Sequence, residues 1–537
     1  MRSKVLAVAV ASALGLISHA AFAQDSTDTS TSKPVRTHRT TSSSSASDKA
    51  EIEMLKSQLA ALQAQLNAQA AQVSALQERT DAQSDINVSQ GQATEATQKQ
   101  IAATQKYVDD AKAGKLDYKG VQLTLGGFLE AASIYRSKDL GADMASTFSI
   151  PYKQTATSHT HETRFSERQS RLSLLATADI NPDVHVSGYY EGDFLGAAQT
   201  ANQNQSNSFT PRTRNVYAAL DWDSAGLHLL AGDSWSLLTL NAKGITPRTE
   251  QLPPSIDAQY VPGFTWARQN QIRIVKDWGK VFWLGLSLEN PQTTFATTKV
   301  PAGVTYNQTG GSGFNSANNI SLNQTPDVIL KAALDPGWGH YEVFGLGREF
   351  YNRFGGTNHT EHGGGFGLGM ILPLVPKILD FQFSGMTGKG IGRYGTAGLS
   401  DVTFRPDGSL APIKETMLLG GLTLHAGSDV DIYAFGGQER QQKEAFTVGT
   451  TPYGYGNPLY VNSGCDIEGS PLTCVGNTQK ISQGTLGFWW RFYQGKYGKV
   501  QFGAQASHTE RKAFEGIGGA PSASDNMLFT SLRYYPF

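Results

Sequence analysis

The chain has 537 residues, a net charge of −1 and 17% charged residues, so it carries no basic excess that would indicate nucleic-acid binding. Glycine is abundant, with 57 residues, and the mean hydropathy of −0.32 is too polar for a bundle of membrane-spanning helices. Membrane β-barrels have this averaged profile, because one face of each strand is apolar and the other is polar.

The first 23 residues have the pattern of a secretory signal peptide. Arg2 and Lys4 precede an apolar run at 5–17, and the A-F-A sequence at 21–23 is a cleavage site of small residues. The sequence therefore predicts a signal peptide at 1–23 and export of the remaining chain. After it, no segment reaches the roughly 18 consecutive apolar residues that a transmembrane helix needs.

Two further segments precede the main body of the chain. Residues 24–50 are rich in serine and threonine and almost free of apolar side chains, which predicts a disordered linker. In the segment 51–112, apolar residues recur at alternating steps of three and four, with Gln69 as the one polar residue of the series: Ile52, Leu55, Leu59, Leu62, Leu66, Val73 and Leu76. This heptad pattern predicts a coiled coil and hence an oligomer. The alternative is a single amphipathic helix on a domain surface.

From Lys119 onward the periodicity changes from helical to alternating. In "KVFWLGLSLEN", leucines and a phenylalanine share one face, while the other face carries Trp283, Gly285, Ser287 and Glu289. Similar patterns predict sixteen strands, at about 121–135, 168–180, 184–195, 212–222, 227–236, 264–276, 281–290, 326–335, 340–350, 362–372, 377–387, 413–425, 429–440, 480–492, 498–510 and 525–537. Their lengths suit tilted membrane strands.

The connections between these strands alternate in length. Short turns such as "NPD" at 181–183 and "DSAG" at 223–226 alternate with long stretches, up to 292–325 and 441–479. This layout predicts an all-β fold at 119–537, a 16-stranded antiparallel transmembrane β-barrel preceded by the N-terminal α-helical coiled coil. The last strand must close against the first, and Phe537 at its end fits a strand inserted by the outer-membrane assembly machinery. A soluble β-sandwich is the competing interpretation, but it does not explain long loops on alternate connections.

The only two cysteines, Cys465 and Cys474, are close in sequence and lie within one long connection. Because an exported chain is in an oxidising compartment, the spacing predicts a disulfide. The alternative is a pair of free thiols.

The order of the segments along the chain also resembles that of a known protein family. The polar tail and heptads are followed by "KLDYKGVQLTLGGFLEAASIY", "RQSRLSLLATAD", "VYAALDWDSAGLHLLAGDSWS" and a final "LRYYPF". In these features the chain resembles the DcaP-like family of trimeric outer-membrane porins. The resemblance implies a homotrimer surrounded by outer-membrane lipid, with its coiled coil in the periplasm. It also implies passive uptake of small anionic solutes, dicarboxylates among them.

Alternation assigns charged side chains to the inside of the predicted barrel. The basic candidates are Arg171, Arg273, Lys331, Arg491 and Arg348, and the acidic candidates are Asp193, Glu191, Glu289, Asp380, Glu415 and Asp431. The long connection 237–263 is expected to fold inward and narrow the pore, with Lys243 and Arg248 against Glu250 and Asp257. Opposed basic and acidic walls would orient an anionic solute, and an arginine can pair with a carboxylate through two hydrogen bonds. Alternatively, these charges are ordinary solvated or mutually paired residues.

Alternation places three other arginines on the apolar, outward faces of their strands. Arg168, Arg214 and Arg268 are therefore assigned to the headgroups, a loop or a trimer contact.

No pattern in the sequence indicates catalysis. The glycines of "HGGGFGLGMILP" are followed by prolines instead of the helix that a phosphate loop requires, and neither a nucleophile elbow nor an HExxH motif occurs. We therefore expect no enzyme activity, cofactor or metal. The competing functions are a porin that prefers phosphate or sugars and, from another class, a trimeric envelope tether or adhesin.

Overall fold

The computed structural model describes residues 46–112, 115–197, 209–311 and 318–537. The predicted signal peptide, 1–23, lies outside these residues, as does most of the predicted linker, 24–50. The chain divides into two units, 1–100 and 101–537, which are described separately. Among the described residues, no helix combines the length and apolar character needed to cross a membrane.

A single long helix dominates the N-terminal part. Helix α2 (Ala46–Lys112) has 67 residues, so helical structure begins within the last residues of the predicted linker. The leucines of the heptad pattern are exposed, for example Leu59 at 65% and Leu66 at 65%. Because isolated helices gain little stability without packing, this row of leucines is a surface that a partner helix would cover.

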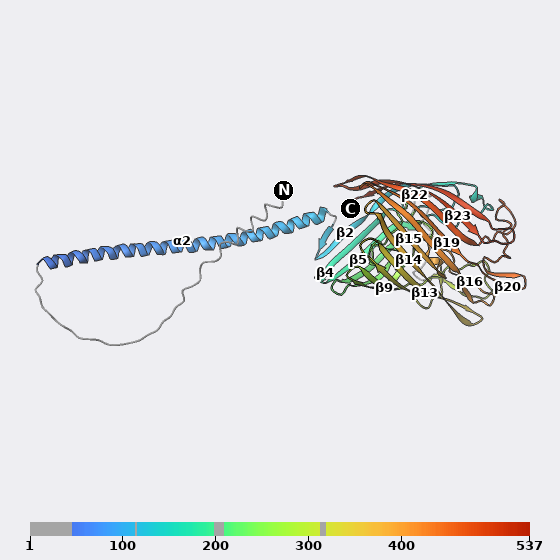
Figure 1. The fold of residues 1–537 in the computed structure, drawn as a ribbon, viewed down its shortest axis with the longest axis horizontal. Coiled ribbons are helices and arrows are strands. Elements are labelled where there is room, and N and C mark those ends of the chain that lie inside the picture. Colours follow the sequence, from blue (N-terminus) through green and yellow to red (C-terminus); the bar gives the residue numbers. More distant parts are fainter. Residues whose placement is uncertain (1–45, 113–114, 198–208, 312–317) are drawn as a thin grey trace. The chain divides into compact units, whose positions relative to one another are not determined.

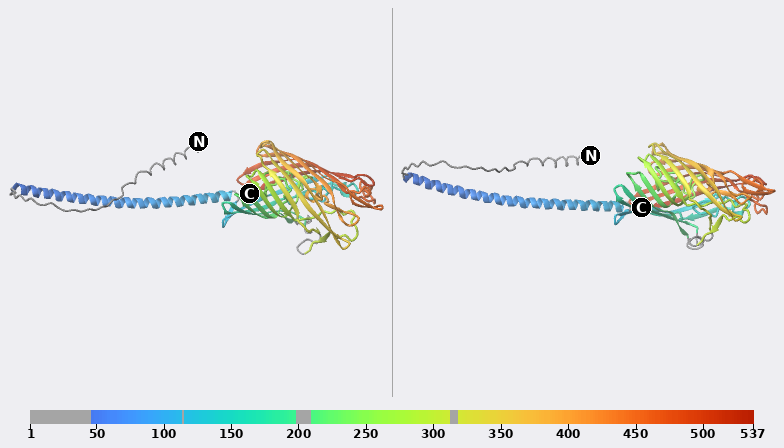
Figure 2. Two further views of the ribbon diagram at one scale, coloured as in Figure 1. Left: turned by 60° about the horizontal axis from the view of Figure 1, so that its bottom comes forward. Right: turned by 90° about the horizontal axis from the view of Figure 1, so that it is seen from below.

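The C-terminal unit is a closed antiparallel β-barrel (Figures 1 and 2). Its main sheet has eighteen strands, two of which are short strands that pair alongside β2: β1 (Lys115–Tyr118) and β3 (Glu162–Ser166). The remaining sixteen form the ring, in order β2 (Val121–Arg136), β4 (Arg171–Asn181), β5 (Val184–Gly196), β6 (Thr210–Trp222), β7 (Leu227–Trp235), β8 (Arg268–Trp278), β9 (Phe282–Glu289), β12 (Asp327–Leu334), β13 (His340–Phe354), β14 (Thr357–Val375), β15 (Leu379–Lys389), β18 (Lys414–Ala426), β19 (Val430–Gln441), β22 (Thr478–Gly495), β23 (Gly498–Ala513) and β24 (Ser522–Tyr535). β24 pairs with β2, which closes the ring.

Small elements outside the ring belong to the long connections. They are three hairpins, β10 (Asn307–Thr309) with β11 (Asn319–Ser321), β16 (Val402–Phe404) with β17 (Leu410–Pro412), and β20 (Glu444–Val448) with β21 (Thr451–Tyr455), and two 3-10 turns, η1 (Ala156–Ser158) and η2 (Gly392–Tyr394). Most connections at one end of the barrel are long, and this end is called the long-loop end. The other is called the short-turn end, because turns such as 223–226 and 427–429 lie there.

The predicted sixteen-stranded barrel is confirmed, and each predicted strand overlaps one strand of the ring. Most strand boundaries differ by one to five residues, as two examples show. Residues 264–267 do not belong to β8 but to the preceding connection, where Phe264 is buried in an apolar cluster. The last strand ends at Tyr535, two residues before Phe537.

Side chains alternate between the inside and the outside of the barrel. In β9, the leucines of one face are exposed, while Trp283, Ser287 and Glu289 of the other face are buried inside. In β24, whose outward face the sequence leaves ambiguous, Leu528 and Leu532 are exposed and Phe529 is buried. An apolar outer surface and a polar interior are the pattern of a barrel surrounded by lipid.

Candidate functional site

The long connection between β7 and β8, residues 236–267, lies inside the barrel and is called the inner loop. Its backbone donates hydrogen bonds to walls on different sides of the ring. Leu237 N lies 2.8 Å from Glu289 Oε1 of β9, and Gly263 N lies 2.8 Å from Glu439 Oε1 of β19. Ile256 N donates to Gln505 Oε1 of β23. The inner loop therefore crosses the lumen.

Contact between the inner loop and the wall depends on a glycine of β19. A Cβ atom placed on Gly437 would lie 1.8 Å from the carbonyl oxygen of Pro262, closer than any real contact. Gly437 therefore allows the backbone of the inner loop to approach the strand directly.

Two of the predicted pore-lining residues are covered by the inner loop. Lys331 is fully buried, with its Nζ 2.6 Å from Glu342 Oε2 and 2.7 Å from the carbonyl oxygen of Thr239. Arg273 is also buried, and its Nη2 donates to the carbonyl oxygen of Trp235. Both side chains face inward as alternation predicts, but neither is exposed to an open lumen. Lys331 holds the inner loop to the wall, and Arg273 binds the end of β7, where the inner loop begins.

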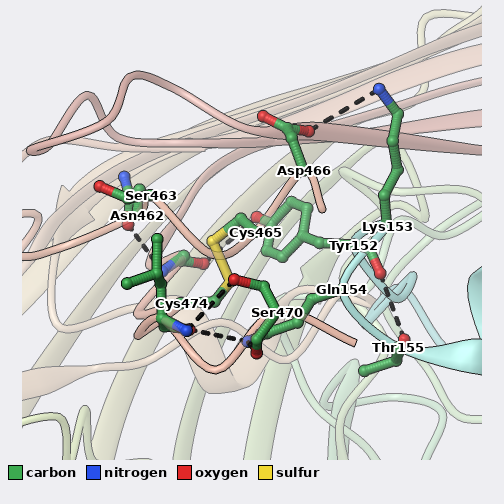
Figure 3. The surroundings of a disulfide bond; sticks show 12 residues. Tyr152, Lys153, Gln154, Thr155, Asn462, Ser463, Cys465, Asp466, Ser470 and Cys474 are labelled. Atoms are coloured by element: carbon green, nitrogen blue, oxygen red, sulfur yellow. Dashed lines mark hydrogen bonds and ion pairs between the residues drawn. A yellow bond between two sulfur atoms is a disulfide. The ribbon is translucent and has the colours of Figure 1, made fainter. Parts of the chain in front are cut away.

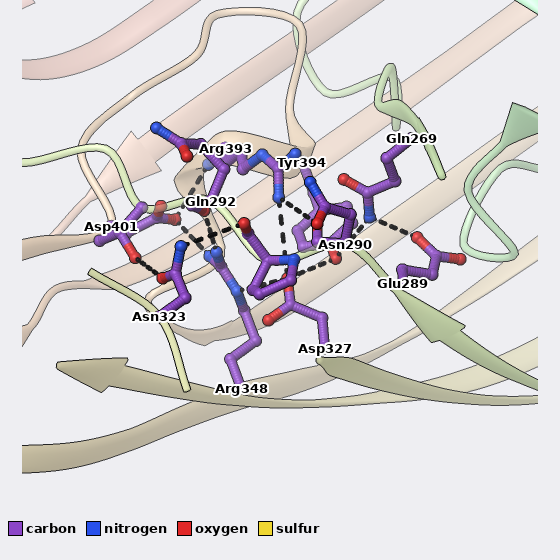
Figure 4. A network of polar contacts seen from close by, with 12 residues as sticks. Gln269, Glu289, Asn290, Gln292, Asn323, Asp327, Arg348, Arg393, Tyr394 and Asp401 are labelled. Atoms are coloured by element: carbon purple, nitrogen blue, oxygen red, sulfur yellow. Dashed lines mark hydrogen bonds and ion pairs between the residues drawn. The ribbon is translucent and has the colours of Figure 1, made fainter. Parts of the chain in front are cut away.

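Arg348 is a third inward side chain that the structure covers (Figure 4). Its guanidinium lies between two carboxylates, 3.0 Å from Asp327 and 2.7 Å from Asp401, and Tyr394 Oη donates to the same Asp327 at 2.7 Å. Because Tyr394 and Asp401 belong to the connection 390–413, this network holds that connection against β12 and β13. The sequence suggests that Arg348 is exposed to a passing solute, but in the structure it is buried.

Neither acidic residue predicted on the inner loop forms an ion pair with Arg248 in the described part of the chain. Asp257 Oδ1 accepts hydrogen bonds from the backbone N–H groups of Ser146 and Gln259, at 3.1 and 2.9 Å, and burial raises the pKa of its carboxyl group. Burial also raises the pKa of Glu250, whose Oε1 has no hydrogen-bond partner in the described part of the chain. These carboxyl groups are thus enclosed by protein.

Lys243 and Arg491 have different surroundings. Lys243 is exposed, and the neighbouring Gly244 N donates to Asp335 at 2.9 Å, at the short-turn end. Arg491 is only partly buried and pairs with Asp431 at 2.5 Å, also near the short-turn end. Neither residue is brought next to the other predicted basic residues.

A cluster of arginines lies where β4, β5 and β6 approach the long-loop end, and we call it the arginine cluster: Arg171, Arg212, Arg214 and Arg268. Arg214 lies 2.6 Å from Glu191 and 3.1 Å from Asp193, Arg212 lies 2.7 Å from Asp193, and Arg171 lies 3.6 Å from Glu191. Arg268 stacks at 4.7 Å over the ring of Trp235 and interacts electrostatically with Glu191. Asp193, predicted in the lumen, is therefore fully engaged with arginines.

Two members of the arginine cluster retain unused donors. Arg171 Nε and Arg268 Nη1 are buried without a hydrogen-bond partner among the described residues. The ion-paired network has three guanidinium groups and two carboxylates, although Asp233 is a further acid near Arg268. Arg171 keeps 17% of its side chain accessible, so this cationic wall can attract a carboxylate or another oxyanion.

The alternation of the sequence assigns Arg214 to the wrong face of the barrel, because β6 contains a β-bulge. The pairing between β5 and β6 shifts between Glu191 and Gly192, so that Glu191 faces Asn215 while Gly192 faces Thr213. Arg214 is the extra residue, and the bulge turns it inward instead of toward lipid. All four residues at 212–215 are polar, including those at positions that would face outward. This pattern indicates in the sequence that the apolar face has ended.

Arg248 of the inner loop approaches the same side of the barrel. It is exposed, and its guanidinium lies 5.8 Å from the ring centre of Tyr189 on β5. Its backbone has a positive φ of 67°, which is uncommon for a residue other than glycine. The inner loop thus presents the exposed guanidinium of Arg248 toward the wall that carries Arg171 and Glu191.

At the short-turn end, four inward histidines are each held between two carboxylates, and we call them the histidine clusters. They are His185 with Asp179 and Asp223, His228 with Asp221 and Asp277, His340 with Asp335 and Glu342, and His425 with Asp380 and Asp431. Both ring nitrogens can donate only when the imidazole is protonated. The clusters therefore place titratable charge around this mouth of the barrel.

The two cysteines are joined in the structure by a disulfide between Cys465 and Cys474 (Figure 3). The bridge closes a small loop in the connection 442–477. Gln154 N donates to the carbonyl oxygen of Cys465 at 3.0 Å, and Gln154 Nε2 donates to that of Leu472 at 2.9 Å. The disulfide loop is thereby attached to the connection 137–170 at the long-loop end.

Comparison with solved structures identifies the fold. The outer membrane channel DcaP of Acinetobacter baumannii superposes with a TM-score of 0.56 at 17% sequence identity, over 79% of this chain and 99% of that one. The anion-selective porin from Comamonas acidovorans matches at 14% identity and a TM-score of 0.44, over 77% of this chain and 99% of that one. Salmonella typhi OmpF in complex with daunomycin matches at 10% identity and a TM-score of 0.44, over 78% of this chain and 99% of that one. No protein-family profile and no curated protein sequence matches the chain.

Proposed function

We propose that the protein is an outer-membrane porin, a water-filled channel for the passive diffusion of small anionic solutes such as dicarboxylates. The observation that carries this proposal is the arginine cluster, which pairs three guanidinium groups with two carboxylates, keeps Arg171 partly accessible and lies on the side of the barrel that the exposed Arg248 approaches. Channel selectivity follows the charges that line the narrowest part.

The path of the solute follows from side-chain exposure. On the β4–β5 wall, Arg171 and Glu191 keep 17% and 13% of their side-chain surface accessible, whereas Lys331 on the far wall keeps 0%. The inner loop is hydrogen-bonded to β9, β12, β13, β19 and β23, and its Arg248 stays exposed beside β5. The solute would therefore pass between Arg248 and the β4–β5 wall.

A solute with two carboxylates suits this arrangement. One carboxylate would pair with the accessible part of the Arg171 side chain, and the other with Arg248 across the passage. The likeness to a solved outer membrane channel supports a channel of this kind at the level of the fold. Because a cluster rich in arginine also suits phosphate, a phosphate-preferring porin is the second candidate.

The rest of the chain has a place in the same proposal. The signal peptide at 1–23 directs export, the linker at 24–50 leads to a periplasmic coiled coil at 51–112, and the barrel at 119–537 is inserted by the outer-membrane assembly machinery. The exposed leucines of α2 support a homotrimer. The short-turn end would face the periplasm and the long-loop end the exterior.

Planar-bilayer recordings test the channel and its charge preference. We expect the wild-type protein to conduct and to give a reversal potential of anion preference in a salt gradient. The double variant Arg171→Gln/Arg248→Gln should lower the anion-to-cation permeability ratio several-fold, because two cations leave the passage. The matched control is Arg353→Gln, which removes an exposed arginine at the long-loop end.

Two results would contradict the proposal. The absence of channel current from correctly folded wild-type protein would overturn the porin function. An unchanged permeability ratio in the double variant would show that Arg171 and Arg248 do not determine the charge preference. Blocking of the current by mono- and dicarboxylates, compared with inorganic phosphate, distinguishes the two candidate solute classes.

A further inference from the structure

A row of five basic residues, which we call the basic row, crosses neighbouring strands on the outside of the barrel near the long-loop end: Lys389, Lys414, Arg440, Lys480 and Lys512. They belong in order to β15, β18, β19, β22 and β23, which are adjacent in the ring. Lys389 is the cross-strand partner of Lys414, and Lys480 is the partner of both Arg440 and Lys512. Four of the five side chains are exposed, and Lys480 is partly exposed.

Alternation places the basic row on the outer surface. The residues next to it in the chain, such as Glu415, Glu439 and Ile481, are buried inside the barrel. Farther along the same outer face, toward the short-turn end, Leu418 and Leu486 are exposed. The basic row thus begins where the apolar outer surface ends, at the level of lipid headgroups in a membrane barrel.

Neighbouring like charges repel each other, because side chains directly opposite on paired strands are only about 5 Å apart. Lys480 lies 3.7 Å from Glu510. Lys389, Lys414, Arg440 and Lys512 form no ion pair with any described residue. Glu510 offsets this repulsion at Lys480, and an anionic partner would relieve it at the other four residues.

A hollow in the outer surface lies at the centre of the basic row. It has a volume of about 990 Å³, and its lining includes Arg440, Lys443 and Glu515 together with apolar Leu418 and Phe514. Cationic groups therefore lie directly beside apolar surface in one concave site. This combination fits an amphiphile that carries both phosphate groups and acyl chains.

We propose that the basic row and its hollow bind the phosphorylated headgroup of an acylated lipid in the outer leaflet of the membrane. The phosphates would lie against Arg440, Lys480 and Lys512, and the first part of an acyl chain would lie along Leu418. This binding goes beyond solute transport. It rests on the proposed orientation, in which the long-loop end faces the exterior, but not on the channel function, because the basic row faces away from the lumen.

Native mass spectrometry of the full chain in detergent micelles tests the proposal, with diphosphoryl lipid A as the probe. We expect the wild-type protein to retain the probe. The triple variant Arg440→Gln/Lys480→Gln/Lys512→Gln should bind it at least about tenfold more weakly, because each basic residue near an anionic lipid surface contributes measurably to binding. The matched control, Lys280→Gln/Lys299→Gln/Lys496→Gln, removes three exposed lysines elsewhere and should bind as the wild type does.

Further measurements separate the possible outcomes. A lipid with a zwitterionic headgroup should bind equally weakly to all three proteins. Displacement of the probe by millimolar inorganic phosphate would overturn the lipid as occupant and indicate a phosphate site. Equal retention by the triple variant would overturn the basic row as the site. Single-channel conductance of the triple variant should match that of the wild type, so a failure of lipid binding is distinguishable from a failure of the channel function.

Discussion

Inside the barrel, most buried charged side chains are paired with the connections that fold into it. Lys331 contacts Glu342 and the inner loop, and Arg348 contacts Asp327 and Asp401. A buried ion pair adds little stability over apolar packing, but the loss of one partner leaves an uncompensated charge. At the scale of single residues, these pairs therefore matter most for how the loops are held.

The substitution Lys331→Met tests this role. We expect it to lower the free energy of unfolding by about 3–5 kcal/mol, because the buried Glu342 would lose its lysine partner and keep only His340. Urea unfolding followed by tryptophan fluorescence measures the change. The double variant Lys331→Met/Glu342→Gln should recover much of the loss, since it removes both charges. Equal destabilisation by the single and double variants would contradict the explanation.

Sequence reasoning assigns the inward direction of Arg273, Lys331 and Arg348, because alternation along a strand determines which face a side chain shares. It does not predict that they are covered. The burial of these three side chains depends on contacts with Thr239, Trp235 and Asp401, which are distant from them in sequence. These contact residues lie in connections that have no periodic pattern, or directly before one. For Arg214, alternation predicts the wrong face, because a bulge is a local feature that the apolar pattern does not reveal.

At the scale of elements, the strands were predictable and the connections were not. The strands must satisfy lipid outside and a polar interior, so each carries its own alternating pattern. The inward course of 237–263 was expected from its length and position, whereas its contacts with β9, β19 and β23 come from single side chains and glycines. The hairpin of β20 and β21 was not predicted, because it lies in a long connection.

The glycine beneath the inner loop gives a prediction about this element. Gly437→Ala should displace the loop from β19, because its Cβ would overlap the carbonyl oxygen of Pro262. We expect a larger and noisier single-channel conductance in bilayers. Gly436→Ala is the matched control, since the nearest atom to its Cβ is 3.9 Å away. Identical recordings from both variants would show that the inner loop does not limit the current.

The disulfide gives a second prediction at this scale. Cys465→Ser/Cys474→Ser should loosen the connection 442–477 without unfolding the barrel, since closing a loop of this length contributes about 2–3 kcal/mol to local stability. Limited proteolysis should then cut within this connection at lower protease concentrations than in the wild type. The heat-modifiable migration of the barrel on gels is the control and should not change.

At the scale of the whole molecule, the two ends of the barrel differ in charge chemistry. The histidine clusters surround the short-turn end, and the basic row follows the outside of the long-loop end. A histidine loses a positive charge as the pH rises, so the short-turn mouth becomes more negative. The conductance properties of the channel should therefore depend on the pH at that side.

This dependence can be measured directly. Raising the pH on the short-turn side should lower the anion preference of the wild-type channel, because four imidazoles lose their charge there. The variant His185→Gln/His228→Gln/His340→Gln/His425→Gln should show a weaker pH response. His362→Gln/His508→Gln replaces exposed histidines on the outer face and should respond as the wild type does. An equal response in all three proteins would exclude the histidine clusters as the cause.

The oligomeric state is the remaining property of the whole molecule that the sequence pattern predicts. A row of exposed leucines along α2 has no partner in the described part of a single chain, and a heptad pattern buries such a row between parallel helices. A cysteine in that row, Leu66→Cys, should therefore form disulfides between chains on mild oxidation of the full-length protein. Ala64→Cys, on the opposite side of the helix, should form far fewer. In a trimer, pairing leaves one chain in three unlinked, so the dimer band should approach about two thirds of the protein. Equal cross-linking at both positions would mean that α2 does not associate through its leucines, and the trimer would then depend on the barrels alone.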